Sequence, residues 1–288
     1  MKYRFIERQQ RLYAVKRLCG LLGIPCSSYY AWKKRKPSQQ AQNKGMLIEH
    51  IRRIHHLSRR TYGSPRVYAQ LRRQGVTCSL KRVAKLMQQD GLRGRRRYRR
   101  VVTTHSQHHL AVAPNRLNRE FSADWPDQKW VADITYIPTE EGWLYLAGVM
   151  DLFSRKIVGW AMSSQIDANL VERALHMALY QRRPGQGLMH HSDRGSQYAS
   201  CQIRTLLEAN RIQVSMSGTG NCYDNAVMES FWSTLKNEWV HQQKYRTRAQ
   251  AITDIFAYIE GFYNIARLHS TLGYMTPAEY EAVYHQSP

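Results

Sequence analysis

The sequence predicts an α/β fold with a mixed five-stranded sheet, preceded by an all-helical and strongly basic region. Charge divides unevenly along the chain: residues 1–119 carry 29 Lys and Arg against 3 Asp and Glu, whereas residues 120–288 carry 14 against 18. β-Branched and aromatic runs that are typical of strands begin only after about Asp127. The two parts of the chain are therefore expected to fold differently.

The basic part contains two candidates for a helix-turn-helix. In the first, "LCGLLGIPCSSYYAWKKRK", one helix is predicted to end at Gly23 and the next to be capped by Ser27. In the second, Pro65 suits a first helical turn, and Ser79 caps a helix that ends at Gly91. The apolar face of that helix is predicted to consist of Leu80, Val83, Ala84 and Met87.

A basic block of this density indicates a polyphosphate partner. Lys81, Arg82 and Lys85 point away from the predicted apolar face, so they and Arg66 are candidate contacts with double-stranded DNA. The alternative is a solvated basic face on a small helical domain. The following stretch, "RGRRRYRRVV", is too charged to pack and is predicted to follow a DNA backbone as a linker.

The second part predicts the order β-β-β-α-β-α-β-α. Three successive antiparallel strands are expected in "QKWVADITYIPT", "GWLYLAGVMDLFSRK" and "IVGWAMSS". A helix capped by Asp167 follows, then a strand in "GLMHHSD", a helix, a strand in "QVSMSG", and a final helix in "NAVMESFWSTLKNE". This order predicts a mixed sheet flanked by helices rather than a plain parallel α/β sheet.

The final helix is amphipathic, with one stripe that should face the core. The stripe consists of Met228, Phe231, Trp232, Leu235 and Trp239. Glu229 lies beside it, with Lys236 two turns along on nearly the same line. We expect the second face of this helix, which also carries Asn225, to have a function.

Acidic residues in the second part are ambiguous when each is taken alone. Asp133 lies within an apolar strand, and Asp193 ends the fourth strand. Asp151 is best interpreted as a turn residue, and Asp224 as one that caps or precedes the final helix.

Taken together, Asp133, Asp193 and Glu229 could converge on hard cations through oxygen ligands alone. Two Mg²⁺ ions about 3.5–4 Å apart would clamp an in-line phosphoryl transfer. The chain contains no G-x-S-x-G, Walker loop or cysteine–histidine arrangement. His190 and His191 are adjacent in a strand, so at most one could line such a site.

These residues and their spacing make the chain similar to a known family. It resembles the integrase-core DDE transposases of bacterial insertion sequences, specifically the OrfB product of the IS-three family. In sequence order, the matching stretches are "YGSPRVYAQL", "KWVADITYI", "DLFSRKIVGW", "HHSDRGSQY", "GNCYDNAVMESFWSTLKNE" and "YIEGFYNIARLHSTLGYMTPAEY". Asp193 and Glu229 are separated by 35 residues, and Lys236 lies seven beyond Glu229.

The resemblance implies a ribonuclease-H-like core and DNA transposition. It implies that Asp133, Asp193 and Glu229 bind two Mg²⁺ ions, with Mn²⁺ as a substitute, and that Lys236 holds the donor DNA end. Donor-strand cleavage at the element ends would release a 3′-hydroxyl, and the first transfer would join one end to the other as a circular intermediate. The chain departs from the family at "NIARLHS", which replaces part of a basic run, and no upstream leucine zipper is present.

The predicted organisation has five parts: an N-terminal basic helical segment (1–42), a helix-turn-helix-like DNA-binding domain (43–100), a basic linker (101–124), a ribonuclease-H-like DDE catalytic core (125–245) and a C-terminal helical segment (246–288). Expected partners are the terminal inverted repeats, target DNA, further copies of the chain and an upstream OrfA product, by fusion or alongside it. Nothing resembles a signal peptide or membrane span. We therefore expect a bacterial cytoplasmic, nucleoid-associated protein.

Two other functions compete with strand transfer. One is a metal-dependent nuclease on the same core that only hydrolyses DNA. The other is a DNA-binding regulator whose core has lost activity. The intact carboxylate set and Lys236 argue against the regulator, and the basic helical regions favour binding to specific DNA ends.

Overall fold

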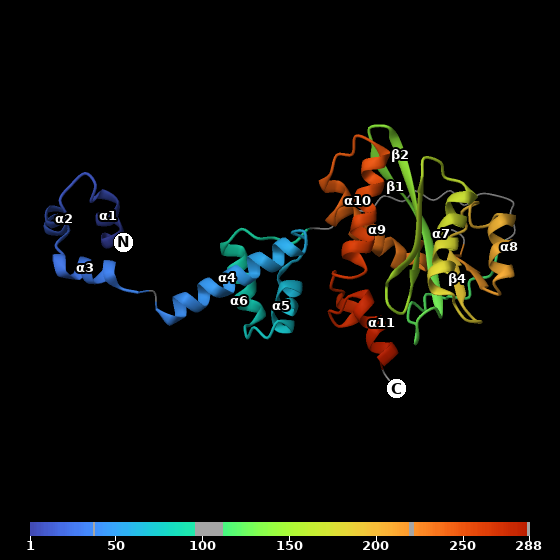
Figure 1. The fold of residues 1–288 in the computed structure, drawn as a ribbon, viewed down its shortest axis with the longest axis horizontal. Coiled ribbons are helices and arrows are strands. Elements are labelled where there is room, and N and C mark those ends of the chain that lie inside the picture. The colour runs from blue at the N-terminus through green and yellow to red at the C-terminus, as the bar shows by residue number, and fades with distance from the viewer. Residues whose placement is uncertain (37, 96–111, 219–221, 287–288) are drawn as a thin grey trace. The chain divides into compact units, whose positions relative to one another are not determined.

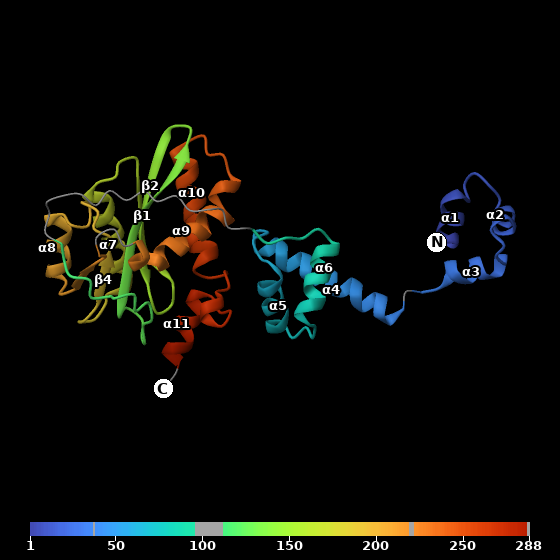
Figure 2. The same cartoon turned by 180° about the vertical axis from the view of Figure 1, so that it is seen from behind.

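The computed structural model describes residues 1–36, 38–95, 112–218 and 222–286. It divides the chain into two compact units, Met1–Arg53 and Ile54–Pro288. Figures 1 and 2 show the elements of both units from opposite sides. Residues 96–102 of the stretch "RGRRRYRRVV" and residues 101–111 of the linker predicted at 101–124 lie outside the described residues.

The first unit contains three short helices and the start of a longer one. Their bounds are α1 Lys2–Gln9, α2 Val15–Leu22, α3 Cys26–Lys34 and α4 Gln39–Leu57. Gly23 follows α2 with φ of 63°, as the predicted helix end requires. The next helix begins at Cys26 with Pro25 at its N-cap, so the prediction that Ser27 caps it is wrong. A proline with φ of −65° is already suited to a helix start, without help from a serine side chain.

The helical part of the second unit contains α5, Ser64–Arg73, and α6, Leu80–Gln89. Ser79 caps α6 as predicted, because its hydroxyl accepts from the Arg82 backbone N–H. Only part of the predicted apolar face of α6 is correct. Val83, Leu86 and Met87 are buried, whereas Leu80 and Ala84 are exposed.

The sheet has five strands in the order β3-β2-β1-β4-β5. Their bounds are β1 Lys129–Thr139, β2 Gly142–Asp151, β3 Ile157–Ser163, β4 Met189–Ser192 and β5 Gln213–Met216. The pairs β1/β2 and β2/β3 are antiparallel, and β1/β4 and β4/β5 are parallel. The predicted mixed sheet and element order are confirmed.

Helices cover both faces of this sheet. α7, Ala168–Arg182, and α8, Cys201–Ala209, contribute to a core that includes Ala132 of β1. The neighbouring residue, Asp133, contacts α9, Ala226–Glu238. Adjacent residues in a strand face opposite sides, so α7 and α9 cover opposite faces. Asp133 therefore lies on the face of the sheet that α9 covers, and Figure 1 shows α7 and α9 at the sheet.

Close packing of α7 on β3 depends on a glycine. A Cβ at Gly159 would lie 2.3 Å from the Ala174 carbonyl oxygen and 2.7 Å from the Ala178 Cβ. Backbone atoms cannot move aside as a flexible side chain can. The helix therefore approaches the strand at a distance that only glycine permits.

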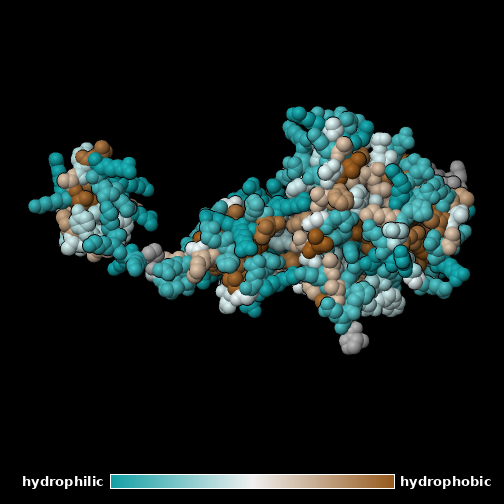
Figure 3. Space-filling view, in the orientation of Figure 1, coloured by the Kyte–Doolittle hydropathy of each residue, from teal (hydrophilic) through white to brown (hydrophobic). Residues whose placement is uncertain are grey.

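The rest of the chain folds against the sheet domain through α10, Arg248–Tyr258, and α11, Pro277–Gln286. Shorter helical segments are η1 Cys222–Asn225, η2 Val240–Gln242, η3 Ile259–Tyr263 and η4 Ser270–Leu272. Hydrophilic residues cover most of the visible surface (Figure 3). No helix among the described residues is both long and apolar enough to cross a bilayer.

Candidate active site

Asp133 and Asp193 are brought together by two parallel strands. The last paired residues of β1 and β4 are Val131 and His191, and each aspartate lies two residues farther along its own segment. Burial, and after it the negative charge of Asp193, raises the pKa of Asp133 to about 7. The two carboxylates therefore interact electrostatically, in a partly buried site.

Both oxygens of the half-buried Asp133 carboxylate accept hydrogen bonds. Oδ1 accepts from the Ile134 backbone N–H at 2.9 Å, and Oδ2 from Trp232 Nε1–H at 3.0 Å. Lys236 stabilises the ionised form further. These contacts favour the carboxylate, but they do not offset the effects of burial and Asp193.

Lys236 projects from α9 toward the same carboxylate. Its Nζ lies 4.4 Å from the centroid of the Tyr136 ring, a cation–π contact. Burial lowers the pKa of Lys236, and the charge of Asp133 opposes that effect. The predicted basic residue is thus close enough to Asp133, one of the predicted metal ligands, to interact with its charge.

Asp193 begins a tight turn after β4. Its Oδ1 accepts the backbone N–H of Gly195 at 2.9 Å. The buried Tyr198 lies close to both aspartates, since burial and then the charges of Asp133 and Asp193 raise the pKa of its hydroxyl. The tyrosine therefore remains protonated.

Glu229 lies in the first turn of α9 and is half-buried. It is three residues before Trp232, a spacing that puts the two on one face of a helix. Even so, no three His, Cys, Asp or Glu side chains within the described parts of the chain are arranged to hold one metal ion. The structure thus gathers Asp133, Asp193 and Lys236, with Glu229 one helical turn from the indole that contacts Asp133.

The gathered residues fit a divalent cation in their chemistry. Carboxylate oxygens are the donors that Mg²⁺ prefers. The charge of Asp193 raises the proton affinity of Asp133, and a cation between the two carboxylates would offset that repulsion. A bound cation would therefore favour the ionised form of Asp133, which burial, and after it the charge of Asp193, disfavours.

Asn225 and Asp224 have structural contacts near the start of α9. Asn225 Nδ2 donates to the Ala132 carbonyl at 2.9 Å, so this buried side chain connects the start of α9 to β1 and has a structural contact on the face that was expected to be functional. Asp224 precedes α9, as predicted, and accepts from Gly218 N–H at 2.8 Å and Arg119 Nε at 3.0 Å. Both residues therefore stabilise the segment that precedes α9.

Asp151 and the two histidines are also structural. Asp151 opens a turn as predicted, with Oδ2 accepting the Ser154 N–H at 3.0 Å. His191 Nδ1 is 2.8 Å from the Ser215 hydroxyl, on the face opposite to the buried His190. Neither histidine contributes to a three-residue metal group among the described residues.

The predicted DNA contacts divide into two groups. Lys81, Arg82 and Lys85 are exposed on α6, as a DNA-binding surface requires. Arg66 instead makes contacts within the protein, because Nε donates to the Leu268 carbonyl at 3.0 Å and Nη1 lies 3.7 Å from Glu238 Oε1. A DNA contact by Arg66 stays an untested prediction.

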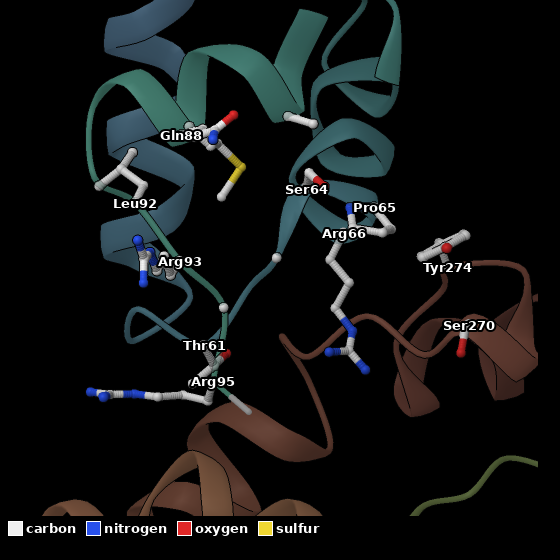
Figure 4. Close-up of a pocket in the computed structure, with 14 residues that line it drawn as sticks. Thr61, Ser64, Pro65, Arg66, Gln88, Leu92, Arg93, Arg95, Ser270 and Tyr274 are labelled. Atoms are coloured by element: carbon white, nitrogen blue, oxygen red, sulfur yellow. The ribbon is translucent and has the colours of Figure 1, made fainter. Parts of the chain in front are cut away.

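Arg66 also lines a groove of about 1030 Å³ that includes Arg93, Arg95, Ser270 and Tyr274. Figure 4 shows its side chain extending from α5 toward the segment that carries Ser270, whereas Arg95 extends away from that segment. The three predicted carboxylates do not line this groove. The groove is therefore separate from the carboxylate site.

Two residues of the site were not predicted as functional. Trp232 was assigned to the core stripe, and Tyr198 was part of a matching stretch without an assigned role. A signal for Trp232 exists, since it follows Glu229 by three residues and precedes Lys236 by four. A tryptophan in an apolar stripe has an indole N–H that usually finds a hydrogen-bond acceptor when the ring is buried.

Family profiles match both the helical part and the sheet-containing part of the chain. The profile described as "Integrase core domain" matches residues 123–222, and a second integrase core profile matches 210–277. The profile described as "HTH-like domain" matches residues 42–100. A solved intasome structure of simian T-cell lymphotropic virus aligns with a TM-score of 0.49 at 14% identity, covering 82% of this chain and 74% of that one.

Relatives align over nearly the whole chain. The 31 kDa protein of insertion element IS600 from Shigella sonnei is 44% identical over 269 residues, 93% of this chain and 99% of the relative. The transposase InsF of insertion sequence IS3A from Escherichia coli (strain K12) is 38% identical over 283 residues, 98% of each chain. The chain therefore belongs to the IS-three family of insertion-sequence transposases, and its integrase core makes it a DDE polynucleotidyl transferase.

Proposed function

We propose that the chain cuts the ends of a DNA element and transfers the released strand, with Asp133, Asp193 and Glu229 holding two Mg²⁺ ions. One observation carries the proposal: both aspartates lie two residues past the last backbone pair of adjacent parallel strands, Val131 with His191. Carboxylates placed in this way are a ligand pair for hard cations. Glu229 supplies the third carboxylate from the first turn of α9.

The metal ions, with Mn²⁺ as a substitute for Mg²⁺, would stabilise negative charge on the attacking and leaving oxygens of phosphoryl transfer. The chain's own residues then position the DNA. Lys236, partly desolvated beside Asp133, holds a phosphate of the donor end. No protein nucleophile is required, because water and a DNA 3′-hydroxyl make the attacks.

Each step exchanges one P–O bond for another. In cleavage, a water oxygen adds to phosphorus and the 3′ oxygen leaves, taking up a proton to become a hydroxyl. In transfer, this hydroxyl loses its proton and its oxygen adds to a second phosphodiester, whose 3′ oxygen leaves in turn. The first transfer joins one element end to the other, and the resulting circle is then integrated into target DNA.

Different parts of the chain would have different tasks. We assign binding of the terminal inverted repeats to residues 43–100, all of which lie within the region matched by the HTH-like profile, and chemistry to residues 125–245. The exposed Lys81, Arg82 and Lys85 support the first assignment. Because two DNA ends must be held at once, the active species is a dimer or larger assembly on DNA, with an OrfA segment supplied by fusion or in a separate chain.

The test is a joining assay with purified full chain, Mg²⁺ or Mn²⁺, and labelled DNA that carries the element ends. We expect nicked ends and joined products from the unaltered protein. Asp193→Asn and Glu229→Gln should abolish both products while leaving DNA binding intact. Full joining by Asp193→Asn would overturn the metal-site assignment.

The same assay separates strand transfer from simple hydrolysis. A nuclease would nick the labelled end and never produce a joined molecule. A DNA-binding regulator would retain the DNA and produce neither product. Salt-sensitive binding is expected of all three functions and does not distinguish them.

A further inference from the structure

We propose that Trp232 is a positioning residue that orients the Asp133 carboxylate for metal binding. This inference rests on the assignment of Asp133 as a metal ligand under Proposed function. Trp232 belongs to the buried stripe of α9, with 6% of its surface exposed. Its indole Nε1–H nevertheless donates to Oδ2 of Asp133 at 3.0 Å.

The orientation of the carboxylate is set by two donors of different origin. The Ile134 backbone N–H binds Oδ1 at 2.9 Å, and the Trp232 indole binds Oδ2 at 3.0 Å. A carboxylate held at both oxygens loses little further freedom when a cation binds. Outer hydrogen bonds of this kind orient the ligand and raise metal affinity.

The indole is itself held in place by packing. Gly148 pairs with Asp133 across β1 and β2, and a Cβ at Gly148 would lie 2.8 Å from Cη2 of Trp232. The Phe231 ring lies 4.8 Å from the Trp232 rings, measured between centroids. The glycine therefore leaves room for the indole to lie directly over the strand pair that carries its acceptor.

Trp232 also links two elements of the proposed site. Glu229 lies one turn before it and Lys236 one turn after it on α9, whereas Asp133 belongs to β1. The bond between Trp232 and Asp133 therefore sets the register of the helix residues against the strand carboxylate. Loss of the N–H should loosen this register even when the ring remains packed.

Three other tryptophans make the same type of bond elsewhere. Their indole N–H groups donate to carboxylates at 2.7–2.9 Å in the pairs Trp130–Asp127, Trp160–Glu260 and Trp239–Asp254. A hydrogen bond from a tryptophan to a carboxylate is therefore not by itself evidence of a functional site in this protein. What distinguishes Trp232 is that its acceptor interacts electrostatically with Asp193. Trp239, which directly follows α9, provides a matched control.

The experiment compares Trp232→Phe with Trp239→Phe in the full chain. Both changes keep an aromatic ring and remove one indole–carboxylate bond. Mg²⁺ affinity is measured by calorimetry on the free protein, and joining is measured against Mg²⁺ concentration. We expect Trp232→Phe to weaken Mg²⁺ binding about 10-fold or more, with joining partly recovered at high Mg²⁺, and Trp239→Phe to leave Mg²⁺ binding unchanged.

A second variant removes the N–H without changing the bicyclic shape. Benzothienylalanine at position 232 replaces the indole N–H by sulfur, so packing over Gly148 is retained. It should show the same loss of Mg²⁺ affinity as Trp232→Phe. If this variant binds Mg²⁺ as tightly as the unaltered protein does, the positioning role is wrong. This conclusion holds even if Trp232→Phe is unstable.

Asp133→Asn distinguishes the two proposals. If this variant still binds Mg²⁺ and joins DNA as the unaltered protein does, the metal-site assignment fails, and the role of Trp232 fails with it. If Asp133→Asn loses Mg²⁺ binding while both changes at Trp232 leave it intact, only the positioning role is wrong.

Discussion

Arg267 encloses the carboxylate of Glu238 at the end of the helix that carries Glu229 and Lys236. Nη2 of Arg267 donates to Oε1 at 2.6 Å and Nε donates to Oε2 at 2.8 Å. The Tyr258 hydroxyl donates to Oε2 at 3.0 Å, and all three side chains are buried. The last turn of α9 is therefore held by a satisfied buried ion pair.

Glu238→Gln should destabilise the protein strongly. The change keeps the shape but leaves Arg267 buried without a counter-charge, which costs about 3–5 kcal/mol. Denaturant unfolding measures the loss. Glu49→Gln is the control, since its pair with Arg52 at 2.7 Å is exposed and contributes about 0–1 kcal/mol. Equal small losses in both variants would contradict the assigned role of the buried pair.

His190 and His191 predict acid sensitivity. Burial lowers the pKa of His190 to about 3 and that of His191 to about 4. The pKa of an unfolded histidine is about 6.5. The contribution of the two histidines to the unfolding free energy should therefore be fully present above pH 6.5 and be lost as the pH falls toward their pKa values in the folded protein. At pH 5, each histidine should reduce the unfolding free energy by about 2 kcal/mol.

Substitution distinguishes the two histidines. Neither ring nitrogen of His190 has a hydrogen-bond partner in the described part of the protein, so His190→Leu should flatten the pH dependence without loss at pH 7.5. His191→Leu removes contacts with Ser215 and Ser217 and should cost about 1–2 kcal/mol at that pH. Denaturant unfolding at pH 5, 6.5 and 7.5 measures both. An unchanged pH slope for His190→Leu would refute its contribution.

Asp133→Asn should stabilise the metal-free protein. A carboxyl whose folded pKa is raised to about 7 favours folding when protonated and opposes it as the pH rises through that value. At pH 8 without metal, we expect a melting temperature higher by about 2–4 °C or more. Added Mg²⁺ should raise the melting temperature of the unaltered protein and not that of the variant.

Asp254→Asn is the control for that measurement. Asp254 also accepts an indole N–H, from Trp239 at 2.7 Å, and a hydroxyl, from Tyr245 at 2.6 Å. Its neutralisation should not raise the melting temperature, and the response to Mg²⁺ should persist. A stabilised Asp254→Asn variant would show that carboxylate repulsion at Asp133 is not the cause.

Removal of the exposed cations of α6 should weaken DNA binding at all salt concentrations and reduce its salt dependence. For a triple alanine variant of Lys81, Arg82 and Lys85, the slope of log K against log salt should fall by about 0.9 for each lost phosphate contact. Fluorescence anisotropy across a salt series measures the slope. Lys244→Ala, also exposed, is the control, and an unchanged slope in the triple variant would exclude this surface.

Arg66→Ala should behave differently from the triple variant. Its guanidinium contacts Leu268 and Glu238, so its loss should lower stability by about 1–2 kcal/mol and leave the salt slope unchanged. The same anisotropy and unfolding measurements test this. A slope reduced by about one unit, with unaltered stability, would make Arg66 a phosphate contact.

Much of the fold could be predicted because its signals are local. Strand alternation, the caps at Ser79 and Asp167, and the glycine after α2 depend on residues a few positions apart. The cap expected at Ser27 failed for a reason of the same kind, because Pro25 had already started the helix. Boundary residues of helices were the least predictable, as Leu80 and Ala84 show.

By itself, the sequence determined the order of the elements, the division of charge and the spacing of Asp133, Asp193 and Glu229. Tertiary structure decided which neighbours these residues have. Parallel pairing of β1 with β4 brings Asp133 and Asp193, which are 60 positions apart in the sequence, close enough to interact electrostatically. Packing of α9 over Gly148 turns Trp232 toward Asp133, and the fold of the C-terminal segment draws Arg66 inward. A local sequence pattern determines whether a side chain tends to be buried. Which atoms that side chain contacts depends on the packing of segments that are distant in the sequence.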